Sequence, residues 1–217
     1  MFESWEGDGQ PVTYLDLNTA GAIPTLAEQY ASPGLTVLNE VITHAQDAGA
    51  QTAVIEYRYL DADYRDEHAK FWSTTFRRFP SVAHRLHFFR NPIGEVATDV
   101  EPFHFEKFDY VGYAVMRPIP TAPVGRTMLP LPERPDGPTV VLCETNDYVS
   151  LMGSHLTVRG APFYSQDAQL TRCGQAAMLS TGYYYHLAFG EPRMLPGDIA
   201  NAAGANSGEF GRSTPSP

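Results

Sequence analysis

Cys173 is the residue whose type and surroundings point most clearly to chemistry. It ends a polar loop and is followed by Gly174 and a run of small and apolar residues, which predicts a helix that begins at the cysteine. The first turn of a helix has unpaired N–H groups and the positive end of the helix dipole, and both favour a thiolate. A thiolate attacks carbonyl carbons. Gln166, in the preceding loop, can add its side-chain amide to the Cys173 N–H as an oxyanion hole.

This stretch resembles the papain-like cysteine peptidases, and within them the bacterial peptidase-like group that processes bacteriocin leaders. That group carries an aromatic residue, a glutamine, a short spacer, Cys-Gly and an alanine-containing helix, and residues 162–186 repeat this order with a spacer one residue longer than is usual. The resemblance implies that Cys173 is the nucleophile, that Gln166 helps to hold the oxyanion, and that the substrate is a peptide or protein. It implies no cofactor and no metal.

The general base is not assigned by these residues. His186 is the one histidine after Cys173, and thirteen residues of helix separate the two. That spacing corresponds to about 20 Å, far beyond the ~3 Å of a hydrogen bond. His155, upstream, is the candidate within this chain. In the family the base follows the cysteine, so the resemblance also implies the front portion of a longer protein, with a nucleophile and an incomplete active site.

Two other functions stay open. One is a non-catalytic interaction module, in which the N-terminal unit binds a partner and Cys173 is a buried, unreactive thiol. The other is an acyltransferase that forms the same acyl-enzyme. A peptidase predicts an accessible and reactive Cys173 with a histidine within reach. Cys143 lies inside the apolar strand expected at 139–144 and is expected to lie in the core as a small hydrophobic residue.

Two clusters of charged residues have a structural and a functional interpretation. Carboxylates and an imidazole between Asp61 and His68 are possible ligands of a divalent cation, but they also fit a helix start with Asp61 as its N-cap, and we expect that structural role. Basic and aromatic residues alternate from Arg77 to Arg90. We expect this segment to bind a protein partner or to pair with the acids at 61–67. The net charge of −10 argues against nucleic acid as the partner.

The elements that position these residues predict an α+β fold. We expect a loose leader (1–13), a small N-terminal α/β unit (14–104), a β-rich region (105–203) that feeds a papain-like, cysteine-bearing helix, and a disordered tail (204–217). The first unit should contain a helix from 35 to about 48, a strand at 52–60, a helix that continues to Pro80, and a strand at 84–90. Along the 52–60 strand, alternation predicts Glu56 and Arg58 on one face and Tyr57 and Tyr59 on the other.

The β-rich region should begin with a strand at 110–116, followed by a proline-rich loop. Strands at 139–144 and 148–158 are expected to form a hairpin whose turn lies at Thr145-Asn146-Asp147. A helix should then cover 174–188, and another should start near Asp198.

Composition excludes several classes of protein. Hydrophobic residues make up 43% of the 217 residues, which is enough for a packed core. No apolar run approaches the ~20 residues of a transmembrane helix, and the N-terminus does not have the pattern of a signal peptide. Two cysteines cannot form a disulfide scaffold. We therefore expect a cytoplasmic protein that does not contact membranes.

Overall fold

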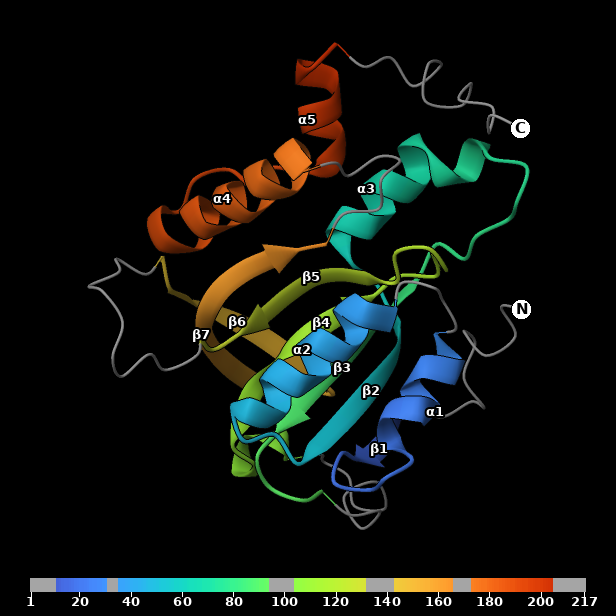
Figure 1. Ribbon diagram of the computed structural model, residues 1–217. Coiled ribbons are helices and arrows are strands. Elements are labelled where there is room, and N and C mark those ends of the chain that lie inside the picture. The colour runs from blue at the N-terminus through green and yellow to red at the C-terminus, as the bar shows by residue number, and fades with distance from the viewer. Residues whose placement is uncertain (1–10, 31–34, 94–103, 132–142, 166–172, 205–217) are drawn as a thin grey trace.

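A computed structural model gives the fold and describes residues 11–30, 35–93, 104–131, 143–165 and 173–204 (Figure 1). In these residues seven strands form one antiparallel sheet in the order β1-β2-β3-β4-β5-β7-β6. The strands are β1 (Val12–Asp16), β2 (Thr52–Tyr59), β3 (Ala83–Phe89), β4 (Tyr110–Met116), β5 (Val124–Leu129), β6 (Thr145–Leu151) and β7 (Ser154–Tyr164). The helices are α1 (Ala22–Gln29), α2 (Leu35–Asp47), α3 (Ala62–Lys70), α4 (Cys173–Phe189) and α5 (Pro196–Ala202), with short 3₁₀ turns η2 (Trp72–Thr74) and η4 (Phe105–Lys107). The predicted α+β class is confirmed.

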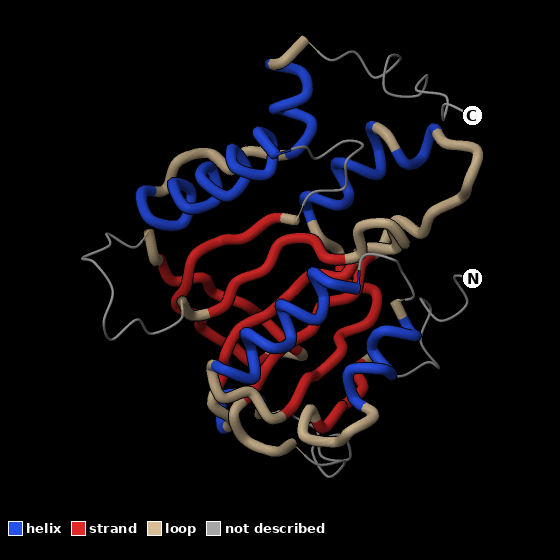
Figure 2. The backbone as a smooth tube through the Cα atoms, viewed as in Figure 1, coloured by secondary structure: helices blue, strands red, loops and turns tan. Residues whose placement is uncertain are grey.

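The sheet is covered by different elements on its two faces (Figure 2). On one face, α1 and α2 pack Leu26, Leu38 and Ile42 against β2, β3 and β4. The sheet curls, so that apolar residues of β6 and β7 share the core of the other face with β2, β3 and the segment around Trp72. Alternation along β2 explains the division, because Ile55 faces the first core and Val54 the second.

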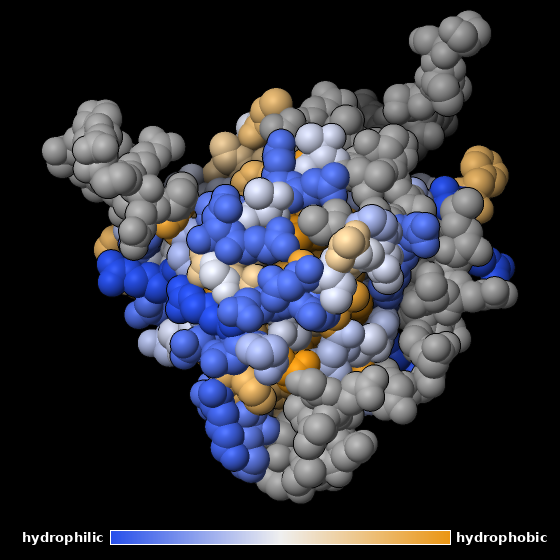
Figure 3. Space-filling view, turned by 60° about the horizontal axis from the view of Figure 1, so that its bottom comes forward, coloured by the Kyte–Doolittle hydropathy of each residue, from blue (hydrophilic) through white to orange (hydrophobic). Residues whose placement is uncertain are grey.

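The cysteine-bearing helix lies at the end of the sheet that the last strands form. α4 packs on β6 and β7 and against α5, and α5 also contacts α3 (Figure 1). Residues far apart in the sequence therefore meet beneath α4. On the face seen in Figure 3, described hydrophilic side chains cover most of the surface and apolar ones form separate patches.

The strands expected at 52–60, 84–90 and 110–116 and the helix expected at 35–48 are confirmed by β2, β3, β4 and α2. The hairpin predicted from strands at 139–144 and 148–158 is wrong. The observed hairpin joins β6 and β7, so the predicted second strand spans two strands and the turn between them, and most of the predicted first strand lies outside the described residues. Thr145 to Asp147 open β6, and the turn lies at Met152-Gly153, whose φ angles are +47° and +86°. Two consecutive left-handed residues suit the right-handed twist of a two-residue hairpin, and this favours glycine in the second position.

The helix predicted to continue to Pro80 ends at Lys70. Hydroxyl groups explain the early end, since Thr74 and Thr75 donate to the backbone oxygens of Phe71 and Trp72 and stabilise a 3₁₀ turn there. Strand β5 and helix α1 were not predicted. β5 lies between prolines that resemble loop markers, although its interior is apolar and buried.

The predicted boundary at 104/105 separates β3 from β4, which are hydrogen-bonded neighbours in the same sheet. The division into two units stays a prediction. Of the predicted leader, Val12 and Thr13 belong to β1, and Val12 is buried. Residues 205–217 of the predicted tail lie outside the described residues. No described helix has the length and apolar character needed to cross a bilayer.

Candidate functional site

Cys173 is the first residue of α4, and its side chain is exposed. The helix has 17 residues and is held to the molecule by Ala176, Leu179 and Tyr183, which pack with Tyr164 and Ile199. The predicted helix start is confirmed. An exposed thiol at a helix N-terminus is the arrangement that the nucleophile hypothesis requires, and it differs from the buried thiol expected of an interaction module.

Neither histidine considered from the sequence is hydrogen-bonded to Cys173. His155 is exposed near the start of β7, where its backbone N–H donates to Glu106 Oε1 over 3.2 Å. Cys173 follows the opposite end of that strand, whose path is roughly 33 Å long at the usual rise per residue. His186 lies within α4, and its Nδ1 is 2.6 Å from the backbone oxygen of Glu191. Gln166 lies outside the described residues.

The prediction that Cys143 lies in the core is wrong, because its side chain is exposed. Cys143 precedes β6, and the pairing of β6 with β7 begins only at Thr145, so β7 does not cover the cysteine. The chain holds two exposed thiols, only one of which is at a helix N-terminus.

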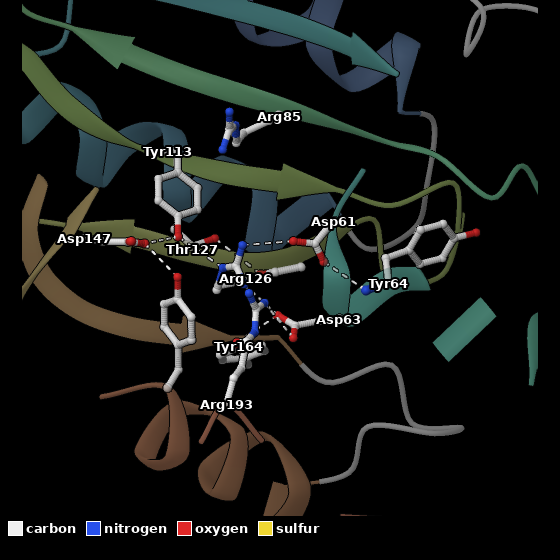
Figure 4. Close-up of polar contacts among 12 residues, drawn as sticks. Asp61, Asp63, Tyr64, Arg85, Tyr113, Arg126, Thr127, Asp147, Tyr164 and Arg193 are labelled. Atoms are coloured by element: carbon white, nitrogen blue, oxygen red, sulfur yellow. Dashed lines mark hydrogen bonds and ion pairs between the residues drawn. The ribbon is translucent and has the colours of Figure 1, made fainter. Parts of the chain in front are cut away.

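Three of the four acids at 61–67, Asp61, Asp63 and Glu67, are buried and paired with arginines, and Asp66 pairs with Lys70. Asp61 accepts a hydrogen bond of 2.9 Å from the Tyr64 N–H and is the predicted N-cap of α3. Arg126 of β5 reaches Asp61 and Asp63, each over 2.9 Å (Figure 4). Arg117 forms a separate buried pair with Glu67 at 3.0 Å. The structural role predicted for this cluster is confirmed by the N-cap, and the arginines named here, Arg117 and Arg126, lie outside the Arg77–Arg90 segment.

The pairs around Arg126 belong to a network that continues to α4. The hydroxyl groups of Tyr113 and Tyr183 both donate to Asp147 Oδ2, over 2.6 and 2.9 Å. Asp63 accepts a hydrogen bond of 2.9 Å from the Tyr164 hydroxyl. The residues that we call the Arg126 network are Asp61, Asp63, Tyr113, Arg126, Asp147, Tyr164, Tyr183 and Arg193.

Electrostatics in the Arg126 network follow from its burial. Burial, with a smaller contribution from the Asp61 charge, raises the pKa of Asp63, while Arg126 and Arg193 oppose the rise. Arg193 approaches Asp63 Oδ1 to 2.8 Å from the segment that follows α4. Burial also raises the pKa of Tyr183 to about 12, so its hydroxyl keeps the proton that it donates. The network therefore ties α4 to α3 and to the last four strands.

Sequence reasoning missed this network, although one signal was present. Arg117 and Arg126 flank or interrupt apolar strand segments, where an isolated arginine usually requires a buried acid. The acids themselves were visible at 61–67. Which arginine meets which acid depends on a sheet that brings together residues 65 positions apart, as in the pair of Asp61 and Arg126.

The Arg77–Arg90 segment does not form one surface. Arg77, Arg78 and Arg90 are exposed, but His84, Arg85 and His87 are buried in β3. The interaction surface predicted for this segment is therefore reduced to its three exposed arginines and the aromatic residues around them.

Arg85 forms a second buried cluster instead. It pairs with Glu56 at 2.8 Å and stacks on the ring of Tyr59 at 4.0 Å. The predicted faces of the 52–60 strand are wrong, because Arg58 has a φ of +56° and the pairing of β2 with β3 is irregular between Glu56 and Tyr59. This bulge places Glu56 and Tyr59 on the same side of the sheet.

Comparison with known proteins gives no relative: no family model, curated protein or solved structure matches the chain. The resemblance of residues 162–186 to cysteine peptidases stays a prediction.

Proposed function

We propose that this chain is a cysteine peptidase-like protein whose nucleophile is Cys173. The observation that carries the proposal is the exposed thiol at the first residue of a 17-residue helix. The positive end of the helix dipole favours the thiolate at such a position. Among the described residues, a Cβ added at the neighbouring Gly174 would meet nothing within 4 Å.

The chemistry would be acyl transfer through a thioester. The Cys173 thiolate attacks the carbonyl carbon of an amide, and the Cys173 N–H and the Gln166 side-chain amide donate to the developing oxyanion. The C–N bond then breaks and the amine leaves with a proton. Water hydrolyses the thioester and restores the thiol. The group that moves the proton is unassigned.

The test compares the two exposed thiols of the same molecule. We expect iodoacetamide to label Cys173 at least ~10-fold faster than Cys143 at pH 6.5, with the ratio falling toward pH 9, because only Cys173 has a helix N-terminus to favour its thiolate. Peptide mass spectrometry separates the two rates. Cys173→Ser and Cys143→Ser variants assign each signal. Equal rates with the same pH profile would contradict the proposal.

The same assay tests the predicted base. A slower Cys173 rate in His155→Ala, with an unchanged rate in the His186→Ala control, would assign His155 to the site. We expect neither variant to change the rate, because neither histidine forms a hydrogen bond to Cys173. A rate that stays constant removes His155 from the proposal and leaves the nucleophile intact.

A non-catalytic interaction module is the second candidate function. It is favoured by the outer side of α4, where Met178, Tyr185 and Phe189 are 49%, 50% and 64% exposed. The helix contains no acidic or basic residue other than His186. An exposed apolar surface of this kind is typical of a site that binds another protein. Equal labelling of the two cysteines would favour this function over the first.

A further inference from the structure

A groove of about 520 Å³ lies beside α4. It is formed between the helix and the segment at 191–194, which returns along it. Gly182 allows the close approach of that segment, because a Cβ at this position would lie 3.1 Å from the Cβ of Met194. The residues that line the groove are Ala177, Met178, Thr181, Gly182, Tyr185, Glu191, Pro192 and Met194.

The groove is apolar along the helix and charged at one end. Helices at the surface of globular proteins usually expose charged side chains, and α4 exposes alanine, methionine, threonine and tyrosine instead. Glu191 is exposed just beyond the end of the helix. Within the described part of the chain its carboxylate takes part in no ion pair, so it is available to a basic group.

Cys173 lies on the same side of α4 as the groove. Ala177 follows Cys173 by one helical turn, so both lie on the same side of α4. Twelve residues separate Cys173 from Tyr185, which corresponds to about 18 Å of helix. An extended peptide of about five or six residues covers that length. A peptide bound in the groove with its basic end at Glu191 would therefore bring its other end to the thiol.

We propose that this groove binds an extended peptide segment that carries apolar side chains and one terminal basic residue. The apolar side chains contact the stretch from Ala177 to Tyr185, and the basic residue pairs with Glu191. Charge favours this ligand over a second copy of the chain, because two copies that each carry a net charge of −10 repel one another. Peptide binding is inferred from the groove alone. The inference that the bound peptide presents an amide to Cys173 rests on the proposed function.

The experiment measures peptide binding without chemistry. Two fluorescein-labelled hexapeptides of alternating leucine and alanine are used, one with lysine at its N-terminus and one with lysine at its C-terminus. The fluorescence anisotropy of each peptide is recorded as the Cys173→Ser chain is added. We expect at least ~10-fold tighter binding than for the same peptides with serine in place of leucine. The leucine side chains remove apolar surface from water when they enter the groove, and serine side chains do not. Replacing lysine by glutamate should weaken binding by about threefold to tenfold.

Variants in the background of Cys173→Ser place the peptide in the groove. Thr181→Trp fills the groove and should weaken binding at least ~10-fold, whereas the matched control Thr157→Trp, at an exposed position of β7, should leave it unchanged. Glu191→Gln should remove the preference for lysine over glutamate. Circular dichroism checks the fold of each variant, and Ala177→Arg replaces Thr181→Trp should the latter not fold.

Two results would overturn the proposal. One is the absence of saturable binding of the leucine peptides at 1 mM, roughly the weakest affinity that a specific groove would give. The other is binding that Thr181→Trp and Ala177→Arg leave unchanged. If no peptide binds but Thr181→Trp abolishes a dimer seen in sedimentation, the occupant is a second copy and not a peptide.

The nucleophile at Cys173 and the peptide-binding groove are tested independently of one another. Peptide binding together with equal labelling of Cys173 and Cys143 would refute the nucleophile and keep the groove. Fast labelling of Cys173 without peptide binding would refute the groove and keep the nucleophile. The binding assay uses a chain without the Cys173 thiol, so its result does not depend on reactivity.

Discussion

His87 should make the stability of the fold depend on pH in a window that its environment defines. The side chain is fully buried in β3. Its Nδ1 lies 2.9 Å from the Tyr110 hydroxyl, and its Nε2 lies 3.2 Å from Glu56 Oε2 and 3.0 Å from Arg85 Nε. Burial lowers the pKa of His87 to about 4, the Arg85 charge adds to the shift, and the hydrogen bond with Glu56 opposes it.

The sign of the effect follows from which state binds the proton. An unfolded chain protonates a histidine near its ordinary pKa of ~6.5, and the folded chain does so near a pKa of about 4. The stability associated with the neutral ring is therefore present above pH ~6.5 and is lost as the pH falls toward about 4. The full shift corresponds to about 3 kcal/mol, of which about 2 kcal/mol is lost between pH 7 and pH 5.

The perturbation is His87→Gln, which keeps a polar side chain and removes the titration. Urea unfolding is followed by the fluorescence of buried Trp72 at pH 7 and pH 5. We expect the loss of unfolding free energy over this interval to be about 2 kcal/mol smaller in the variant than in the wild type. Other groups, such as Asp63 with its raised pKa, contribute equally to both proteins and cancel in the comparison.

The control is His155→Gln, an exposed histidine on β7 that should keep the wild-type loss. The reasoning is refuted if His87→Gln shows the same loss between pH 7 and pH 5 as the wild type, since the buried ring would then not be the group that resists protonation.

Two further predictions concern the buried charges and the attachment of α4. Glu67→Gln should lower the unfolding free energy by about 3–5 kcal/mol, because it removes a carboxylate that pairs with the buried Arg117 charge. Arg117→Met in the same chain should restore part of the loss. Urea unfolding measures both, and an additive loss in the double variant would contradict the pairing. Tyr183→Phe should cost about 1–3 kcal/mol through the lost hydrogen bond to Asp147, and an unchanged melting temperature would show that this bond does not hold the helix.

Local patterns were sufficient for the elements with clear periodicity. The spacing of apolar residues in α2 and the β-branched and aromatic content of β2 predicted those elements nearly to the residue. The start of α4 at Cys173 was also predicted, because Gly174 and the following small residues mark a change from loop to helix. In each case the information lies within a few residues of the element itself.

Long-range pairing could not be predicted in the same way. Arg85 donates to the backbone oxygen of Ser150 because the curled sheet brings β6 over β3, and no spacing in the sequence records that curl. The pair of Arg117 and Glu67 joins residues 50 positions apart for the same reason. For the candidate site, the sequence identified the thiol but not the groove, since the groove depends on how the segment at 191–194 returns along α4.

The Arg126 network has a consequence for how this chain tolerates change. How well a segment tolerates insertions and deletions depends on its burial and its hydrogen bonds. Here Tyr183 and Arg193 complete the bonding of Asp147 and Asp63, two buried acids that belong to the sheet and to α3. Loss of the helix would leave those carboxylates short of partners inside the protein. A change in α4 or in the segment after it should therefore disturb buried acids in β6 and α3, far from the helix in the sequence.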